Sequence, residues 1–146
     1  MNNKIVDFIN RINEIEKGFG DTIFYSCNES DEIHFIEWVK KLFPNSTLNI
    51  SEIVFFSRVA NGLNFNGLFV YSLTPDIENN IYESNSEWWN NEHQRKYLFL
   101  ADDSISWYCV DTKEAAFLVL DKPSGERITQ CKTFDELILL ALDMAL

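Results

Sequence analysis

Basic residues are scarce in this chain of 146 residues: 12 Lys and Arg stand against 23 Asp and Glu, which gives a formal net charge of −11. No Lys or Arg lies between Lys17 and Lys40, or between Arg58 and Arg95. A polyanion repels the phosphates of nucleic acids and the anionic surface of membranes, so neither is an expected partner. A basic protein is the favoured class of partner, although solubility alone also explains an acidic surface.

Cysteine and long apolar runs are also scarce. Cys27, Cys109 and Cys131 are odd in number and have no Cys-x-x-Cys spacing, which is typical of buried thiols in a reducing compartment. No stretch approaches the roughly 20 apolar residues of a membrane span. The first 17 residues lack the uninterrupted apolar core of a signal peptide. Together these absences predict a cytoplasmic protein.

Recognisable catalytic motifs are absent as well. The sequence has no nucleophile elbow, no Walker loop and no dinucleotide fingerprint, and His34 and His93 are not at metal-ligand spacing. A nucleophilic pair of Cys109 with His93 can be imagined, as can a cation site or glycosidase pair at Asp102 and Asp103. Burial of Cys109 on a strand and a simple turn at the aspartates are the favoured interpretations. The sequence therefore predicts no enzyme, no cofactor and no metal.

The sequence does have a supply of bulky apolar residues, 46% hydrophobic overall, which is enough for a core in a single domain spanning 1–146. Isoleucines at helical spacing predict a first helix from Asn3 to about Lys17. A second helix is expected to begin after an N-cap at Ser30. Its predicted buried face consists of Ile33, Ile36, Val39 and Phe43.

A third helix is predicted from about Glu52 to Ala60. Ser51 is the expected cap, and Ile50 and Phe55 have the spacing of a hydrophobic staple. Asn-Gly at 61–62 then favours the left-handed backbone that ends a helix, and the apolar residues 68–73 predict a strand. Residues 61–73 are therefore a helix-to-sheet junction that contains no catalytic residue.

The polar stretch 74–95 is expected to be an irregular loop with at most a short helix around 86–92. The C-terminal third is typical of a meander, with strands predicted at 97–101, 104–111, 116–120 and 126–131. Turns are expected at 102–104 and 122–125. Within the second of these strands Ile105, Trp107 and Cys109 are expected to share one face. The third strand is nearly all apolar and the fourth is polar, as in an edge strand.

Thr133-Phe-Asp-Glu136 has the pattern of a capping box and predicts a last helix, ending at Leu146. This helix is apolar almost all round, so it either covers the sheet, which is favoured, or forms a self-association surface. Monomer and homodimer both remain open. The order of elements predicts an α+β fold: N-terminal helices, an antiparallel β-meander and a closing C-terminal helix.

Three segments resemble the SUKH superfamily of Smi/Knr-like proteins: 61–68 (NGLNFNGL), 97–110, and 133–138 (TFDELI). The sequence looks most similar to the YrhA-like bacterial branch. The resemblance covers about residues 5–141 and implies a helix that leads into a glycine-marked strand, a meander, and a helix that seals the end.

The resemblance also implies a function. Many bacterial members are immunity proteins that bind and block polymorphic toxins, often nucleases. Because nuclease domains tend to be basic, an acidic inhibitor would complement them. The expected partner is therefore a protein, a basic toxin domain, and the expected activity is neutralisation by direct binding. The alternative is a non-toxin regulatory module or scaffold. The resemblance transfers no catalytic residues.

The candidate contact residues come from the acidic stretch and the turn that follows the first meander strand. The two tryptophans have two interpretations: an exposed binding hot spot ringed by carboxylates, or two anchors of a loop to the core. The candidates are Asp76, Glu78, Glu83, Glu87, Trp88, Trp89, Asp102 and Asp103.

Overall fold

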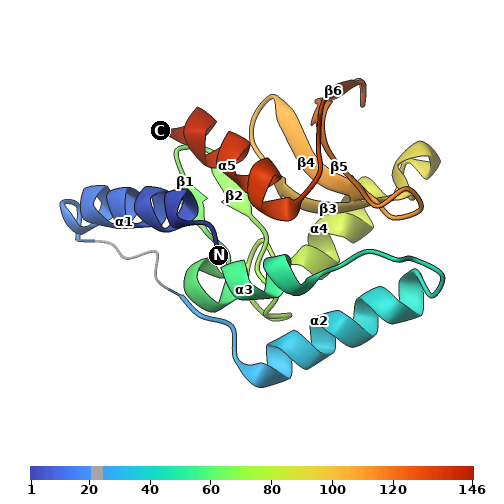
Figure 1. Cartoon of the computed structure of the whole chain (residues 1–146), viewed down its shortest axis with the longest axis horizontal. Helices are drawn as coiled ribbons and strands as arrows, with labels where there is room; N and C mark the ends of the chain where they lie inside the picture. Colours follow the sequence, from blue (N-terminus) through green and yellow to red (C-terminus); the bar gives the residue numbers. More distant parts are fainter. Residues whose placement is uncertain (21–24) are drawn as a thin grey trace.

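A computed structural model describes residues 1–20 and 25–146 (Figure 1). Its N-terminal helices are α1 (Asn3–Lys17), α2 (Glu29–Leu42) and α3 (Ser51–Ala60). Two short strands, β1 (Asn64–Phe65) and β2 (Leu68–Val70), are followed by α4 (Ile81–Trp88) and a single 3₁₀ turn, η1 (Glu92–Gln94). The remaining elements are β3 (Tyr97–Asp102), β4 (Ser106–Asp111), β5 (Ala116–Asp121), β6 (Arg127–Cys131) and α5 (Phe134–Ala145). The α+β prediction is confirmed.

The six strands form one antiparallel sheet whose spatial order, β1 to β6, is the order of the chain. β3, β4 and β5 are buried almost throughout, whereas β6 is exposed along four of its five residues. The predicted polar edge strand and apolar interior strand are therefore confirmed. Pairing of β2 with β3 is limited to Phe69 with Asp102 and Val70 with Ala101, so the N-terminal half of β3 lacks a strand neighbour on that side.

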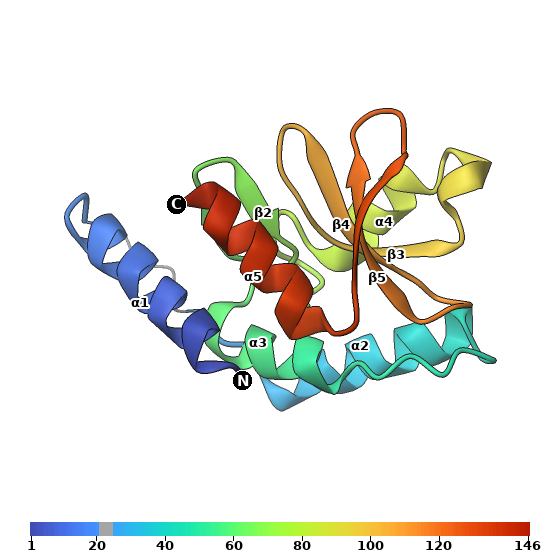
Figure 2. The same cartoon turned by 45° about the horizontal axis from the view of Figure 1, so that its top comes forward.

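The last helix covers the sheet, as Figure 2 shows for α5 lying across the strands. Its inner face buries Phe134, Leu137, Ile138, Ala141 and Leu142. The Phe134 ring meets Phe56 of α3 edge to face at 5.8 Å, and so joins α5 to the N-terminal helices. Covering of the sheet by α5 is confirmed, although Leu140 and Met144 remain on its outer face.

Asparagine and threonine side chains determine where the helices begin. Asn2, Asn28, Asn80 and Thr133 each accept a hydrogen bond from a backbone N–H in the first turn of α1, α2, α4 and α5. The predicted limits of α1 are confirmed. The predicted cap at Ser30 is wrong: the N-cap of α2 is Asn28, two residues before Ser30, and it forms a capping box with Asp31.

Two other predicted caps differ in detail. At α5 the Thr133 hydroxyl accepts from Glu136 N, as expected, but the Glu136 carboxylate accepts from Lys132 N instead of Thr133 N. At α3 Ser51 is the first helical residue and Ile50 precedes it without a side-chain cap. Phe55 is 47% exposed, so the expected staple with Ile50 leaves nearly half of that residue uncovered.

The buried faces of two elements also differ from the sequence prediction. α2 buries Phe35 and Val39, whereas Ile33 is 49% exposed, because Phe35 turns toward the core. Ile105 is 58% exposed: the turn extends to residue 105, so β4 begins only at Ser106. Trp107 and Cys109 are buried as expected.

The junction at 61–73 is as predicted a passage from helix to sheet. Asn61 is buried, and its amide oxygen accepts from Leu73 N (2.8 Å) while its Nδ2 donates to Thr74 Oγ1 (3.0 Å). Gly62 has φ +76°, the left-handed region that favours glycine. The strand is shorter than the predicted 68–73: β2 ends at Val70, and Ser72 instead bridges to Asn80.

Candidate protein-binding surface

The acidic part of the longest stretch without a basic residue, 74–94, forms a loop, α4 and η1. Between residues 74 and 94 five carboxylates occur without Lys or Arg: Asp76, Glu78, Glu83, Glu87 and Glu92. All five side chains are exposed, and within residues 1–20 and 25–146 none of them forms an ion pair. Glu83 and Glu87 are four residues apart and therefore lie on one side of α4. The segment thus carries negative charge that nothing in the described part of the chain neutralises.

α4 is fixed to the sheet by a buried asparagine. The Asn85 side chain is fully buried, and its oxygen accepts from Phe99 N (2.7 Å) while its Nδ2 donates to Phe99 O (2.9 Å) and Ile81 O (2.8 Å). Phe99 lies in the half of β3 that β2 does not reach. The Asn85 amide therefore takes the place of a strand neighbour, and it holds the carboxylates of α4 at a defined position on the sheet. The helix predicted around 86–92 is real but begins five residues earlier, at Ile81.

Trp88, at the end of α4, is a half-buried anchor. Its Nε1 donates to Tyr71 Oη at 3.0 Å, and its ring meets Trp107 edge to face at 5.4 Å. The Lys122 ammonium lies 5.0 Å from the centre of the Trp88 ring, within the range of a cation–π contact. Trp88 is therefore part of an aromatic cluster with Tyr71, Phe99 and Trp107, and only part of its surface is exposed.

Trp89 turns to the other side. Its Nε1 donates to Tyr97 O at 2.7 Å, and its ring stacks on Trp38 of α2 at 5.8 Å. Consecutive residues thus attach α4 to two different parts of the molecule, the sheet and α2. Of the two interpretations of this pair, anchoring to the core describes both side chains, and partial exposure leaves each able to contact a partner.

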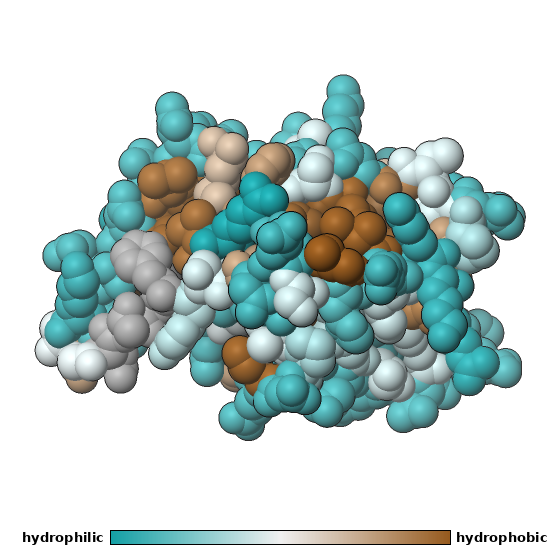
Figure 3. All heavy atoms as spheres, turned by 90° about the horizontal axis from the view of Figure 1, so that it is seen from below, coloured by the Kyte–Doolittle hydropathy of each residue, from teal (hydrophilic) through white to brown (hydrophobic). Residues whose placement is uncertain are grey.

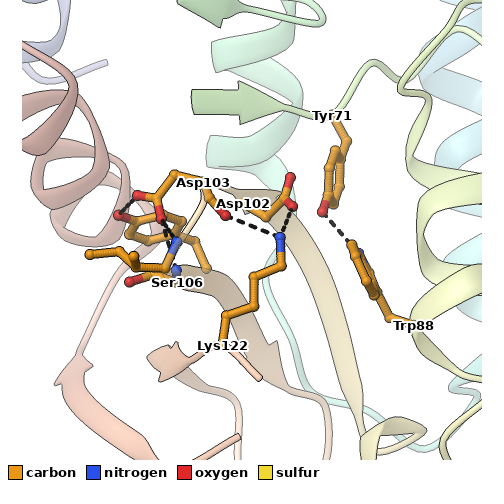
Figure 4. A network of polar contacts seen from close by, with 8 residues as sticks. Tyr71, Trp88, Asp102, Asp103, Ser106 and Lys122 are labelled. Atoms are coloured by element: carbon orange, nitrogen blue, oxygen red, sulfur yellow. Dashed lines mark hydrogen bonds and ion pairs between the residues drawn. The ribbon is translucent and has the colours of Figure 1, made fainter. Parts of the chain in front are cut away.

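Lys122 connects the turn at 102–104 to the aromatic cluster (Figure 4). Its Nζ donates to Asp102 Oδ2 (2.5 Å) and to Asp103 O (3.0 Å). The Asp103 carboxylate accepts from Ser106 N (2.8 Å) and from the Tyr108 hydroxyl (2.7 Å). Both aspartates are therefore engaged within the fold, and Asp102 is neutralised by an ion pair.

The same carboxylates affect the neighbouring tyrosines. Burial, followed by the negative charge of Asp102, raises the pKa of Tyr71 far above its usual range, and Glu87 contributes in the same direction. Burial and the hydrogen bond to Asp103 raise the pKa of Tyr108. Both phenols remain neutral donors or acceptors at any physiological pH.

The structure therefore divides the eight predicted contact residues. It brings Trp88, Asp102 and Asp103 together around Lys122, with Glu87 close enough to act on Tyr71. Asp76, Glu78 and Glu83 lie on the preceding loop and on α4, and Trp89 faces α2. Sequence reasoning missed Tyr71, Trp107 and Lys122. The sequence predicts Lys122 only as part of a hairpin turn, and nothing in its sequence context indicates a contact 20 residues away, with Asp102.

The candidate nucleophile and metal ligands are placed as follows. Cys109 is fully buried, and burial followed by the charge of Asp111 raises the pKa of its thiol. His93 is exposed on η1, and His34 packs edge-on against Tyr82 at 4.8 Å. In the described ranges no three His, Cys, Asp or Glu side chains gather in a metal-binding group. No helix formed by those residues is long and apolar enough to cross a membrane.

Comparison with known proteins finds one kind of similarity, a similar fold in a solved structure. The sequence matches no protein-family model and no curated protein. A crystal structure of a protein from Pseudomonas syringae pv. tomato is similar, with a TM-score of 0.58 over 90% of this chain and 91% of that one. The two sequences are 16% identical, so the likeness concerns the fold alone.

Proposed function

We propose that this protein is an immunity protein that binds a basic toxin domain, a nuclease being the best example, and neutralises it by direct contact. The proposal is supported by the SUKH-like segments of the sequence and by the net charge of −11. The observation that carries it is the set of five exposed carboxylates on the 74–94 segment, which has no Lys or Arg and no ion pair within the described residues.

The fold gives Glu83 and Glu87, the two carboxylates of α4, a rigid support. Asn85 attaches the middle of α4 to β3, and Trp88 and Trp89 attach its end to the sheet and to α2. A pre-formed surface loses little side-chain freedom on binding, which favours affinity. Uncompensated charge at its edge accelerates association with a cationic partner and makes the rate depend on salt. Half-buried Trp88 supplies apolar contact area beside the carboxylates.

Co-expression tests the function. A candidate toxin gene, sought among the genes that neighbour this one, is expressed with and without the protein, and cell growth and complex formation are measured. The proposal expects rescued growth and a complex that copurifies. Failure of both, with recovery of a housekeeping partner from the native host, would instead favour a regulatory scaffold.

Charge variants test the surface. Glu83→Gln combined with Glu87→Gln removes two charges from α4, and Asp7→Asn combined with Asp143→Asn removes two exposed charges from α1 and α5 as a matched control. The α4 pair should slow association with the toxin about 3- to 10-fold at low salt, since edge charges act mainly on the association rate. The control should change it less than about twofold. Equal effects of both pairs would mean that net charge, not this surface, determines binding.

A further inference from the structure

A groove of about 710 Å³ lies between α2 and α3. Its walls are largely apolar and include Ile36, Val39, Phe43, Leu48, Ile50 and Phe55. Figure 3 views the molecule from below, the side on which Figure 1 places α2, and shows hydrophobic surface gathered there and ringed by hydrophilic residues. Ligand-binding pockets commonly have volumes of about 300–1,000 Å³ and walls of this kind.

The two ends of the groove differ. At one end Arg58, near the end of α3, donates to both oxygens of Glu32, near the start of α2, from Nε (2.5 Å) and Nη2 (3.1 Å). The two helices therefore run in opposite directions, and this ion pair closes one end. The other end is formed where α2 ends, where the connecting residues 43–50 pass, and where α3 begins.

The second end carries positive charge. Lys40, in the last turn of α2, lines the groove, and among the residues the structure describes it has no ion-pair partner. α3 begins at this end, where Asn49 Oδ1 accepts from Ser51 N (3.0 Å), and the positive end of the helix dipole lies at the same end of the groove as Lys40. In a chain with a net charge of −11, an apolar groove with a free ammonium at one end complements an anion with an apolar body.

We propose that the groove binds an amphipathic carboxylate, a molecule of the fatty-acid class. The alkyl chain lies along Ile36, Val39 and Phe55, and the carboxylate pairs with Lys40. The site is separate from the α4 surface and does not depend on the function proposed above. Its occupant is a small molecule, and an apolar segment of a protein would not require Lys40.

Two C10 amphiphiles of opposite charge test the site, each titrated calorimetrically below its micelle concentration. Decanoate should bind at least about fivefold more tightly than decyltrimethylammonium, because an ion pair with the exposed Lys40 is worth up to about that factor. Non-specific binding to a polyanion would give the opposite order. Decanoate should also bind about fourfold more tightly than nonanoate, because its alkyl chain has one more methylene to bury and burial of one methylene changes the affinity by about that factor. Equal affinities of the two amphiphiles, or no gain with chain length, would overturn the proposal.

A pair of adjacent lysine variants locates the head group. Lys40→Met should weaken decanoate binding about 3- to 5-fold, the upper range for an ion pair of an exposed lysine. Lys41→Met, an exposed neighbour that does not line the groove, should change it less than about twofold. Equal losses would place the anion elsewhere. The variant with Glu83→Gln and Glu87→Gln should bind decanoate normally, so failure of this site and failure of the toxin-binding surface give different results.

Discussion

Asn85 makes the sharpest energetic prediction of this structure. Its amide is paired with both the N–H and the C=O of Phe99, a residue that is itself fully buried. Asn85→Ala removes both partners, and because no strand lies on that side of Phe99, no other described group is in place to replace them. The small alanine side chain leaves the two backbone groups unpaired in the core.

The magnitude follows from the two lost partners. A buried polar group left unpaired costs about 1–3 kcal/mol, so two such groups reduce the free energy of unfolding by about 2–6 kcal/mol. This loss is a large fraction of the roughly 5–15 kcal/mol that stabilises a typical domain. With a urea m-value of about 2 kcal/mol/M, the unfolding midpoint should fall by roughly 2 M.

Urea unfolding followed by far-UV circular dichroism measures the effect. Ser86→Ala, the next residue of α4, is the matched control, because Ser86 is exposed and its hydroxyl donates only to Tyr82 O in its own helix. The control should change the unfolding free energy by less than about 0.5 kcal/mol. A loss below about 1 kcal/mol for Asn85→Ala would refute the view that this side chain stands in for a strand.

Three further predictions concern glycines, the closing helix and the thiols. Gly62 and Gly67 both have positive φ, but a new Cβ would lie 3.1 Å from Ser72 Cβ at Gly62 and would meet nothing within 4 Å at Gly67. Gly67→Ala should therefore lower the free energy of unfolding in urea by about 1–2 kcal/mol, the cost of the backbone conformation alone. Gly62→Ala should lower it by at least about 1 kcal/mol more, because the new methyl group also crowds Ser72. Leu142→Ala on the buried face of α5 should cost about 2–5 kcal/mol, whereas Leu140→Ala, at a side chain 39% exposed, should cost less than about 1 kcal/mol; similar costs would contradict the assigned face. Burial, with the charges of Glu32 and Asp31, raises the pKa of Cys27 from 9.0 to about 11, so at pH 8 iodoacetamide should alkylate Cys27 about 100-fold more slowly in the native protein than in urea. Because the pKa of Cys27 is higher in the native state than in the unfolded state, the native state binds the thiol proton more strongly. The stability that this difference contributes is present below pH 9.0 and is lost as the pH rises to about 11. Equal free energies of unfolding at pH 8 and pH 10.5 would contradict this prediction.

The sequence predicts well those elements whose residues face a single neighbouring layer. α1 has one apolar stripe and β6 has one polar exposed run, and both were predicted within one residue. α2 is different because it is apolar on several sides. Phe35 faces the core, Ile36 faces the groove, and Trp38 stacks on Trp89. A helix with three apolar contacts has no single periodic face, so the predicted buried set was partly wrong.

For the candidate surface, the sequence predicts the charge of the segment but not its helix limits or its contacts. The absence of Lys and Arg between Arg58 and Arg95 identifies the acidic segment directly. Its helix was misplaced, because Asn80 and Asn85 read as loop residues, whereas one caps α4 and the other is buried against β3. The ion pair of Asp102 with Lys122 depends on how β3 and the β5–β6 turn meet in space. Such a contact has no local sequence signal.

The placement of α5 has a consequence for synthesis of the protein. Every strand of the sheet precedes α5 in the chain, and the face that α5 covers cannot be closed before residues 134–145 have left the ribosome. Until then the nascent chain exposes apolar strand surface to other chains and to chaperones. Premature termination between β6 and Leu142, the last buried residue of α5, should therefore yield a polypeptide that aggregates or is degraded in the cell, and no partly active fragment.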